Sequence, residues 1–137
     1  ELVSGETFAG AASSMARDRA AADHAFARCP HLRRLVSTCR TQVSADHNRL
    51  SGQMFTQAQS METRTYDLTG IIDRIGGGDA FASGVLHGLL RGDDDGEALD
   101  YGIACGCLKH ALPGDISLAT HDDLVEFLGE SSFDVRR

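Results

Sequence analysis

Three consecutive glycines, Gly76, Gly77 and Gly78, stand directly before Asp79 and an apolar stretch with helical spacing. Glycine has no β-carbon, so the backbone amides of such a turn can approach a ligand closely. At the start of a helix these amides lack intrahelical partners, and together they carry about half a positive charge. The segment therefore predicts a concave anion site, with the Asp79 carboxylate at the first helical position beside it.

The same glycine turn also fits a plain helix start with nothing bound, because aspartate is a favoured N-cap residue. A Walker loop is excluded, since no Gly-Lys-Ser/Thr follows the glycines. Gly76, Gly78 and Gly84 do not keep the GxGxxG spacing of dinucleotide sites. A carboxylate beside a phosphate site suits phosphoryl transfer, in which the attacking hydroxyl must lose its proton to a base.

The rest of the chain predicts an α/β layer of helix, strands and then helices. Helices are expected over residues 9–28, 79–91 and about 97–110, and a last one after Thr120 or His121. Gly92 is expected to end the second helix, and Asp94 with Glu97 to form a capping box before the third. Small residues on the second helix predict close packing against a neighbour.

The strands are less sharply indicated. Residues 32–38 are expected to form one strand, followed by a polar turn at residues 39–41. Two or three short strands are expected over residues 43–68, with a hairpin through Ser51 and Gly52 as one arrangement. These elements are too few for a complete doubly wound domain, which favours a part of a larger fold.

Composition narrows the class of protein. The chain has 137 residues, of which 42% are hydrophobic, so it can bury a core. Twenty acidic against 13 basic residues give a net charge of −7, which argues against a general nucleic-acid surface. The apolar runs are too short for a membrane span, and no secretory signal is visible. The cysteines show no zinc-site spacing and are expected to be free thiols; they are Cys29, Cys39, Cys105 and Cys107.

The string from Asp73 to Phe81, DRIGGGDAF, followed by Gly84, resembles the C-terminal signature of the ribokinase-like, or PfkB, sugar kinases. That signature reads D-x-x-G-A-G-D-x-F-x-x-G, and Gly77 stands where alanine is usual. Residues 35–52 and 108–124 are similar to segments of the 2-keto-3-deoxygluconate kinases within the family. The resemblance implies a ribokinase-like three-layer α/β fold. Residues 1–137 would be its C-terminal nucleotide-binding part, without the N-terminal sugar-binding and lid part.

The resemblance also implies roles for single residues. Asp79 matches the catalytic base and Gly76 to Gly78 the anion hole. Positions that hold a monovalent cation in many relatives match Asp73, Ile75 and Gly114. Glu6 stands where the family places a glutamate of the magnesium shell; otherwise it is an acidic residue leading into the first helix.

Three further residues are candidates for contact with ATP. Thr38 and Arg40 are placed near a strand end, where ligands of open α/β sheets gather, although a solvated turn explains them equally. His110 is expected to end a helix, where it would interact with the dipole or line the adenine pocket. Lys109 is expected to face solvent, and His87 to be a packed or partly exposed helix residue rather than a ligand.

The implied function is ATP-dependent phosphorylation of a sugar hydroxyl, with 2-keto-3-deoxygluconate as the expected substrate. ATP and magnesium are the implied cofactors, and potassium is left open. The expected partners are a sugar acid and ATP, with neither nucleic acid nor membrane; a homodimer of the full-length protein is compatible with the family. A cytoplasmic location follows from ATP use, free thiols and the absence of a signal. The 137 residues alone are expected to show little or no kinase activity. The alternatives are another sugar or nucleoside kinase of the family, or a non-catalytic nucleotide-binding remnant.

Overall fold

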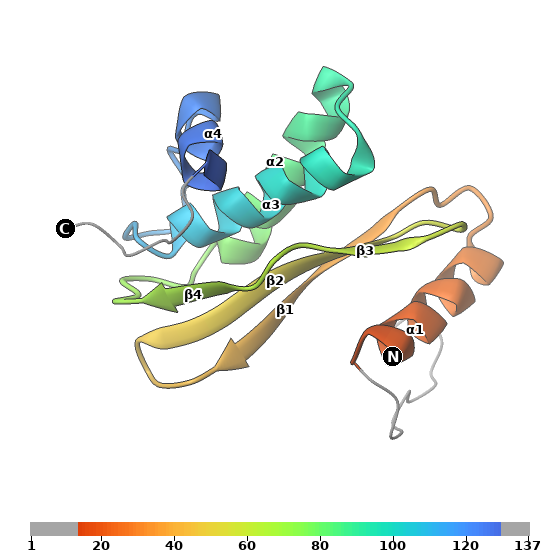
Figure 1. Ribbon diagram of the computed structural model, residues 1–137, viewed down its shortest axis with the longest axis horizontal. Helices are drawn as coiled ribbons and strands as arrows, with labels where there is room; N and C mark the ends of the chain where they lie inside the picture. The colour runs from red at the N-terminus through yellow and green to blue at the C-terminus, as the bar shows by residue number, and fades with distance from the viewer. Residues whose placement is uncertain (1–13, 130–137) are drawn as a thin grey trace.

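The computed structural model describes residues 14–129. It contains three layers, with a four-stranded sheet between one helix on one face and three helices on the other (Figure 1). The first helix, α1 (Ser14–Arg28), is rich in alanine, the best helix former. It confirms the helix expected there over the described part, whereas residues 9–13 and Glu6 lie outside the described residues.

The sheet is antiparallel throughout and is organised around β2 (His47–Phe55). β1 (Leu35–Gln42) pairs with β2 on one side, from Leu35 opposite Phe55 to Gln42 opposite Asn48. On the other side, β3 (Ser60–Glu62) pairs with one end of β2 and β4 (Tyr66–Thr69) with the other. The central strand therefore has partners along both edges.

Two expectations about these strands are wrong. β1 continues to Gln42, so residues 39–41 form no turn, and the chain reverses instead at residues 43–46. Ser51 and Gly52 lie within β2 rather than in a hairpin. A β-carbon on Gly52 would lie 3.0 Å from a ring carbon of Phe81 and 3.2 Å from Leu99. Glycine at this position permits close packing of the helical layer on the sheet, and it does not mark a turn.

Alternate residues of β2 face opposite layers, as the period of a strand requires. Leu50 and Met54 pack against the helical layer formed by α2 (Gly77–Arg91), α3 (Asp95–Lys109) and α4 (His121–Gly129). Phe55 packs on the other face with Ala22 and Phe26 of α1. The two hydrophobic layers hold β1 and β2 in place beneath the start of α2.

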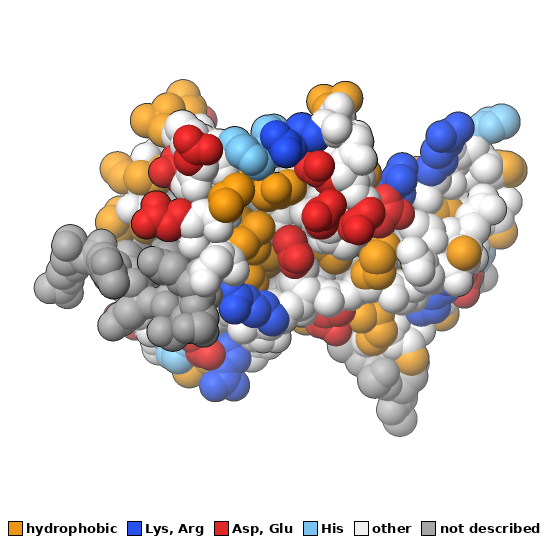
Figure 2. Space-filling view, turned by 45° about the horizontal axis from the view of Figure 1, so that its top comes forward, with side chains coloured by type: hydrophobic (Ala, Val, Ile, Leu, Met, Phe, Trp, Pro, Cys, Tyr) orange, Lys and Arg blue, Asp and Glu red, His pale blue; other side chains and the backbone are white. Residues whose placement is uncertain are grey.

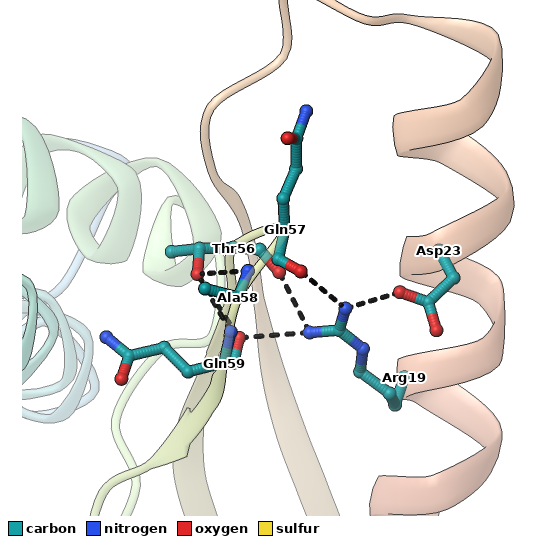
Figure 3. Close-up of polar contacts among 6 residues, drawn as sticks. All are labelled: Arg19, Asp23, Thr56, Gln57, Ala58 and Gln59. Carbon is teal, nitrogen blue, oxygen red and sulfur yellow. Dashed lines mark hydrogen bonds and ion pairs between the residues drawn. The ribbon is translucent and has the colours of Figure 1, made fainter.

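Arg19 ties α1 to the turn between β2 and β3 (Figure 3). Arg19 Nη1 donates to the carbonyl oxygens of Thr56 at 2.8 Å and Gln59 at 3.1 Å. Arg19 Nη2 donates to the carbonyl of Gln57 at 3.3 Å and pairs with the Asp23 carboxylate. The guanidinium thereby satisfies three turn carbonyls beside the short β3 strand.

Helices α2 and α3 cross in close contact, as the small residues of α2 predict. A β-carbon on Gly84 would lie 2.4 Å from the Tyr101 carbonyl oxygen, and one on Gly88 would lie 2.6 Å from Ala98 Cα. The caps expected from the sequence are present: Gly92 ends α2 in the left-handed conformation, and Asp94 forms a capping box with Glu97 at the start of α3. Among residues 14–129, no helix combines the length and the apolar character that crossing a bilayer requires.

Candidate functional site

The glycine turn forms the N-terminus of α2, with Gly76 as its N-cap at φ 77°. A β-carbon on Gly76 would lie 2.2 Å from the carbonyl oxygen of Asp115, so both conformation and packing require glycine there. The helix begins at Gly77, which makes Asp79 its third residue. The expectation that Asp79 is the first helical residue is therefore wrong by two positions, because Gly77 and Gly78 are themselves helical.

The amides of this turn are only partly engaged. The Gly77 amide donates to the Arg74 carbonyl over a long 3.3 Å, and the Ala80 amide donates to Gly76 at 2.8 Å. In the described part of the chain, the amides of Gly78 and Asp79 donate to no carbonyl. A β-carbon on Gly78 would meet no atom within 4 Å. Two consecutive helix-end amides thus lack a carbonyl partner within the described residues, and the predicted anion site at Gly76 to Gly78 stays a prediction.

A pocket of about 390 Å³ opens at these amides. Its volume falls within the roughly 300–1,000 Å³ of small-molecule sites. Arg40, Arg74 and the helix N-terminus line it, which gives the pocket the donors and the positive charge that phosphate oxygens need. Four separate stretches of the chain supply its lining: Thr38, Arg40, Leu50, Arg74, Gly77, Gly78 and His110.

The structure brings Thr38 and Arg40 to the pocket, although the expected reason was wrong. Both residues lie inside β1 rather than at a strand end or in a turn. They are two positions apart, so their side chains share one face of the sheet. In the register of β1 and β2, Arg40 lies opposite Leu50 and Thr38 lies opposite Gly52. The side chains of Thr38 and Arg40 are therefore on the face of the sheet that the helical layer covers.

His110 is the C-cap of α3 and is only 7% exposed. Its Nδ1 lies 2.6 Å from the Gly106 carbonyl oxygen. Since a carbonyl only accepts, the Nδ1 atom of His110 carries the proton of this hydrogen bond. A β-carbon on Gly77 would lie 3.1 Å from His110 Cε1. Glycine in place of the alanine usual in the signature therefore makes room for this imidazole.

The Asp79 carboxylate is exposed, and within the described residues no hydrogen bond or ion pair engages it. It directly follows Gly78 but is not part of the pocket lining. The arrangement places an uncommitted carboxylate at the edge of a cationic pocket, where a group presented at the pocket mouth would meet it.

Asp73, Ile75 and Gly114 are brought together by two hydrogen bonds. Asp73 Oδ1 accepts from the Ile75 amide and Oδ2 from the Gly114 amide, each at 3.0 Å. These donors, the Ile75 amide first, lower the pKa of the Asp73 carboxyl below its ordinary value. Because both carboxylate oxygens of Asp73 accept from backbone amides, these hydrogen bonds hold the loop at Gly114 against the segment that precedes α2. In the described residues no cluster of three or more His, Cys, Asp or Glu side chains could hold a metal ion.

Two features of the site were missed or misjudged from the sequence. Arg74 lines the pocket and its Nη2 also donates to the Ala45 carbonyl, which ties the signature loop to the turn between β1 and β2. Its place within the motif, one residue after Asp73, was the available signal. Lys109, expected to face solvent, is fully buried, and its Nζ donates to the Leu112 carbonyl at 3.0 Å.

The known proteins that resemble this chain are carbohydrate and sugar-acid kinases. The profile of the pfkB family carbohydrate kinases matches residues 54–122. A 2-dehydro-3-deoxygluconokinase of Bacillus subtilis is 41% identical over 59 residues, which are 42% of this chain and 18% of that protein. A 2-dehydro-3-deoxygalactonokinase of Haloferax volcanii is 37% identical over 68 residues, 48% of this chain and 21% of that protein.

Among solved structures, the 2-dehydro-3-deoxygluconokinase of Thermotoga maritima superposes with a TM-score of 0.78 at 26% sequence identity. The match covers 84% of this chain and 35% of that chain. The chain thus spans about a third of this structural relative and about a fifth of the two relatives matched by sequence.

Proposed function

Because the chain belongs to the pfkB family of carbohydrate kinases, we propose that it supplies the nucleotide-side, C-terminal part of an ATP-dependent sugar kinase. The observation that carries this proposal is the pocket at the start of α2. There Arg40 and Arg74 line the same pocket as the open amide end of the helix. A donor-rich pocket of this kind suits the terminal phosphates of a nucleotide better than it suits a neutral ligand.

In the proposed reaction, a sugar hydroxyl oxygen attacks the γ-phosphorus of ATP while the bond to the β–γ bridging oxygen breaks. ADP leaves, and the hydroxyl proton passes to the Asp79 carboxylate. The amides of Gly78 and Asp79 donate to the phosphoryl oxygens, whose charge is greatest in the transition state. Arg40 and Arg74 hold the remaining phosphate oxygens, and His110 fixes the shape of the turn from below.

Magnesium would enter with the nucleotide. The described residues offer no carboxylate cluster for it, and Mg²⁺ is commonly held by substrate phosphates with one or two protein carboxylates. Bound there, it would neutralise phosphate charge. A monovalent cation near Asp73 remains a proposal on the family pattern alone, since both carboxylate oxygens already accept amide hydrogen bonds.

The proposed substrate is 2-keto-3-deoxygluconate, the compound also called 2-dehydro-3-deoxygluconate. The names of the Bacillus subtilis and Thermotoga maritima relatives support it. The Haloferax volcanii relative is named for the galactonate epimer, so a different sugar acid is the second candidate. In this proposal the sugar contacts lie largely outside these residues, and the 137 residues alone turn over ATP little or not at all.

The test is coupled ATP turnover in the full-length protein, with Asp79→Asn against the matched control Asp122→Asn. Both carboxylates are exposed in the first turn of a helix, so their structural cost is similar. Loss of a general base should lower kcat by a factor of about 10² to 10⁴, while the control retains the wild-type rate. An unchanged rate for folded Asp79→Asn would remove Asp79 from the mechanism. ATP binding by the wild type without turnover of any sugar acid would favour a non-catalytic nucleotide-binding role.

A further inference from the structure

Two histidines from different helices meet on the helical layer, away from the nucleotide pocket. His87 of α2 and His121 at the start of α4 are 34 residues apart in sequence, and His87 Nε2 lies 3.1 Å from His121 Nδ1. Both rings are half-buried, so ions in solution can reach them. In Figure 2, histidine side chains lie at the surface of the helical layer, with a Lys or Arg side chain directly beside them and acidic side chains nearby.

The distance between the two nitrogen atoms is that of two imidazoles bound to one metal ion. With metal–nitrogen bonds of about 2.05 Å, nitrogens 3.1 Å apart subtend an angle of about 98° at the ion. This value lies between the right angle of square-planar or octahedral coordination and the wider angle of a tetrahedron. A hydrogen bond between the rings explains the same distance, so a metal ion would replace that proton and the rings would rotate to direct both lone pairs at the ion.

Neighbouring residues orient both rings. The Tyr101 ring of α3 lies 5.7 Å from the His87 ring, edge-on, and 5.4 Å from the His121 ring. Thr120, directly before His121, is held by the Asp123 carboxylate, which accepts from its amide and its hydroxyl at 2.6 Å each. The two ligand atoms are therefore set by packing and by the cap of α4, which lowers the ordering cost of binding an ion.

The surrounding charges permit a cation. Arg91, one turn beyond His87 on α2, is paired with Asp93 at 3.0 Å. The N-terminus of α4 opposes a cation, whereas the exposed Asp122 carboxylate next to His121 attracts one. The chain as a whole carries a net charge of −7.

We propose that His87 and His121 form a two-imidazole site for a late first-row transition metal ion such as Zn²⁺, Ni²⁺ or Cu²⁺. His87 Nε2 and His121 Nδ1 each donate a lone pair, and water completes the coordination. The ring that carried the shared proton moves it to its other nitrogen, so no net proton is released. His87 is half-buried and packed against Tyr101 and His121, as the sequence predicted, and this proposal adds a ligand role that depends on the return of α4 to α2.

The proposed site is separate from the proposed kinase chemistry. His87 lies eight residues beyond Asp79 on α2, about 12 Å along the helix axis. The ion would join α2, which carries the phosphate-binding amides at its other end, to α4. Oxygen-seeking Mg²⁺ should not compete for two imidazoles.

The experiment is calorimetric titration of Zn²⁺ and Ni²⁺ into the untagged full chain, with His87→Gln, His121→Gln and the control His31→Gln. His31 is exposed and lies outside this cluster. One ion per chain is expected, with affinity at least about tenfold weaker in each cluster variant and unchanged in the control. Cu²⁺ electron paramagnetic resonance should show coupling to two nitrogens in the wild type and to fewer in either cluster variant. No stoichiometric binding by the wild type, or wild-type affinity in both cluster variants, would overturn the proposal.

Discussion

The substitution Gly78→Ala separates the two reasons for which glycine can stand at a helix start. Gly78 is the second residue of α2, its φ is not in the left-handed region, and a β-carbon there would touch nothing within 4 Å. Alanine restricts the unfolded chain, so stability should rise by about 0.4–1 kcal/mol.

The same substitution should weaken the binding of MgATP. The added methyl group enters the pocket at the open amides of Gly78 and Asp79 and keeps a phosphate oxygen from reaching them. A hydrogen bond to a charged group contributes about 1.5–3 kcal/mol, so the Kd for MgATP should rise by about 10- to 150-fold. Thermal unfolding and calorimetric ATP titration of the full-length protein measure the two effects.

The matched control is Gly96→Ala. Gly96 is the second residue of α3, and a β-carbon there would meet only the Asp94 carboxylate oxygen at 3.2 Å. It should change stability little and leave ATP affinity unchanged. If Gly78→Ala binds MgATP as tightly as the wild type, the phosphates do not contact these amides, and the proposed anion site is wrong.

Three further substitutions test the framework around the site. Gly84→Ala should destabilise the fold by about 1–3 kcal/mol in chemical denaturation, because its β-carbon would lie 2.4 Å from the Tyr101 carbonyl oxygen; unchanged stability would mean that α2 and α3 do not cross so closely. Asn48→Leu should stabilise by about 1–3 kcal/mol, since the fully buried amide of Asn48 has no hydrogen-bond partner among the described residues; a loss of stability would show that the amide is satisfied. The Asp73 carboxyl should titrate below its ordinary pKa of 3.8 by carbon NMR, because it accepts from the Ile75 and Gly114 amides. A carboxyl with a lowered folded-state pKa stabilises the fold above its unfolded-state pKa, and it loses that contribution as pH falls through the folded-state value. The substitution Asp73→Asn should therefore flatten the decline in stability below about pH 4. A normal titration of Asp73 would contradict the loop contacts.

Features encoded within a few residues could be predicted from the sequence. The C-cap at Gly92 and the capping box of Asp94 and Glu97 depend on local backbone conformation and on side chains three residues apart. The glycine turn before α2 follows the same rule. The three-layer fold followed from the resemblance of a contiguous motif, and the structural relatives confirm it.

Features that depend on distant partners could not be read in this way. Gly52 looks like a turn residue, yet it lies in β2 because Phe81 and Leu99 pack against it. Lys109 lies in the last turn of α3 and was expected to face solvent. Its side chain is buried instead, and its ammonium group donates to the Leu112 carbonyl. Thr38 and Arg40 were selected for the wrong local reason and reach the pocket through their register with β2.

Whether the start of α2 holds a nucleotide is best decided by titrating the isotope-labelled protein with MgATP and following its amide chemical shifts. If this helix end and the arginines opposite it bind the phosphates, the largest shifts should occur at the amides of Gly78 and Asp79. Smaller shifts are expected at Thr38 and Arg40, which line the same pocket. Saturable ATP binding that leaves the Gly78 and Asp79 amides unmoved would contradict the proposed phosphate site.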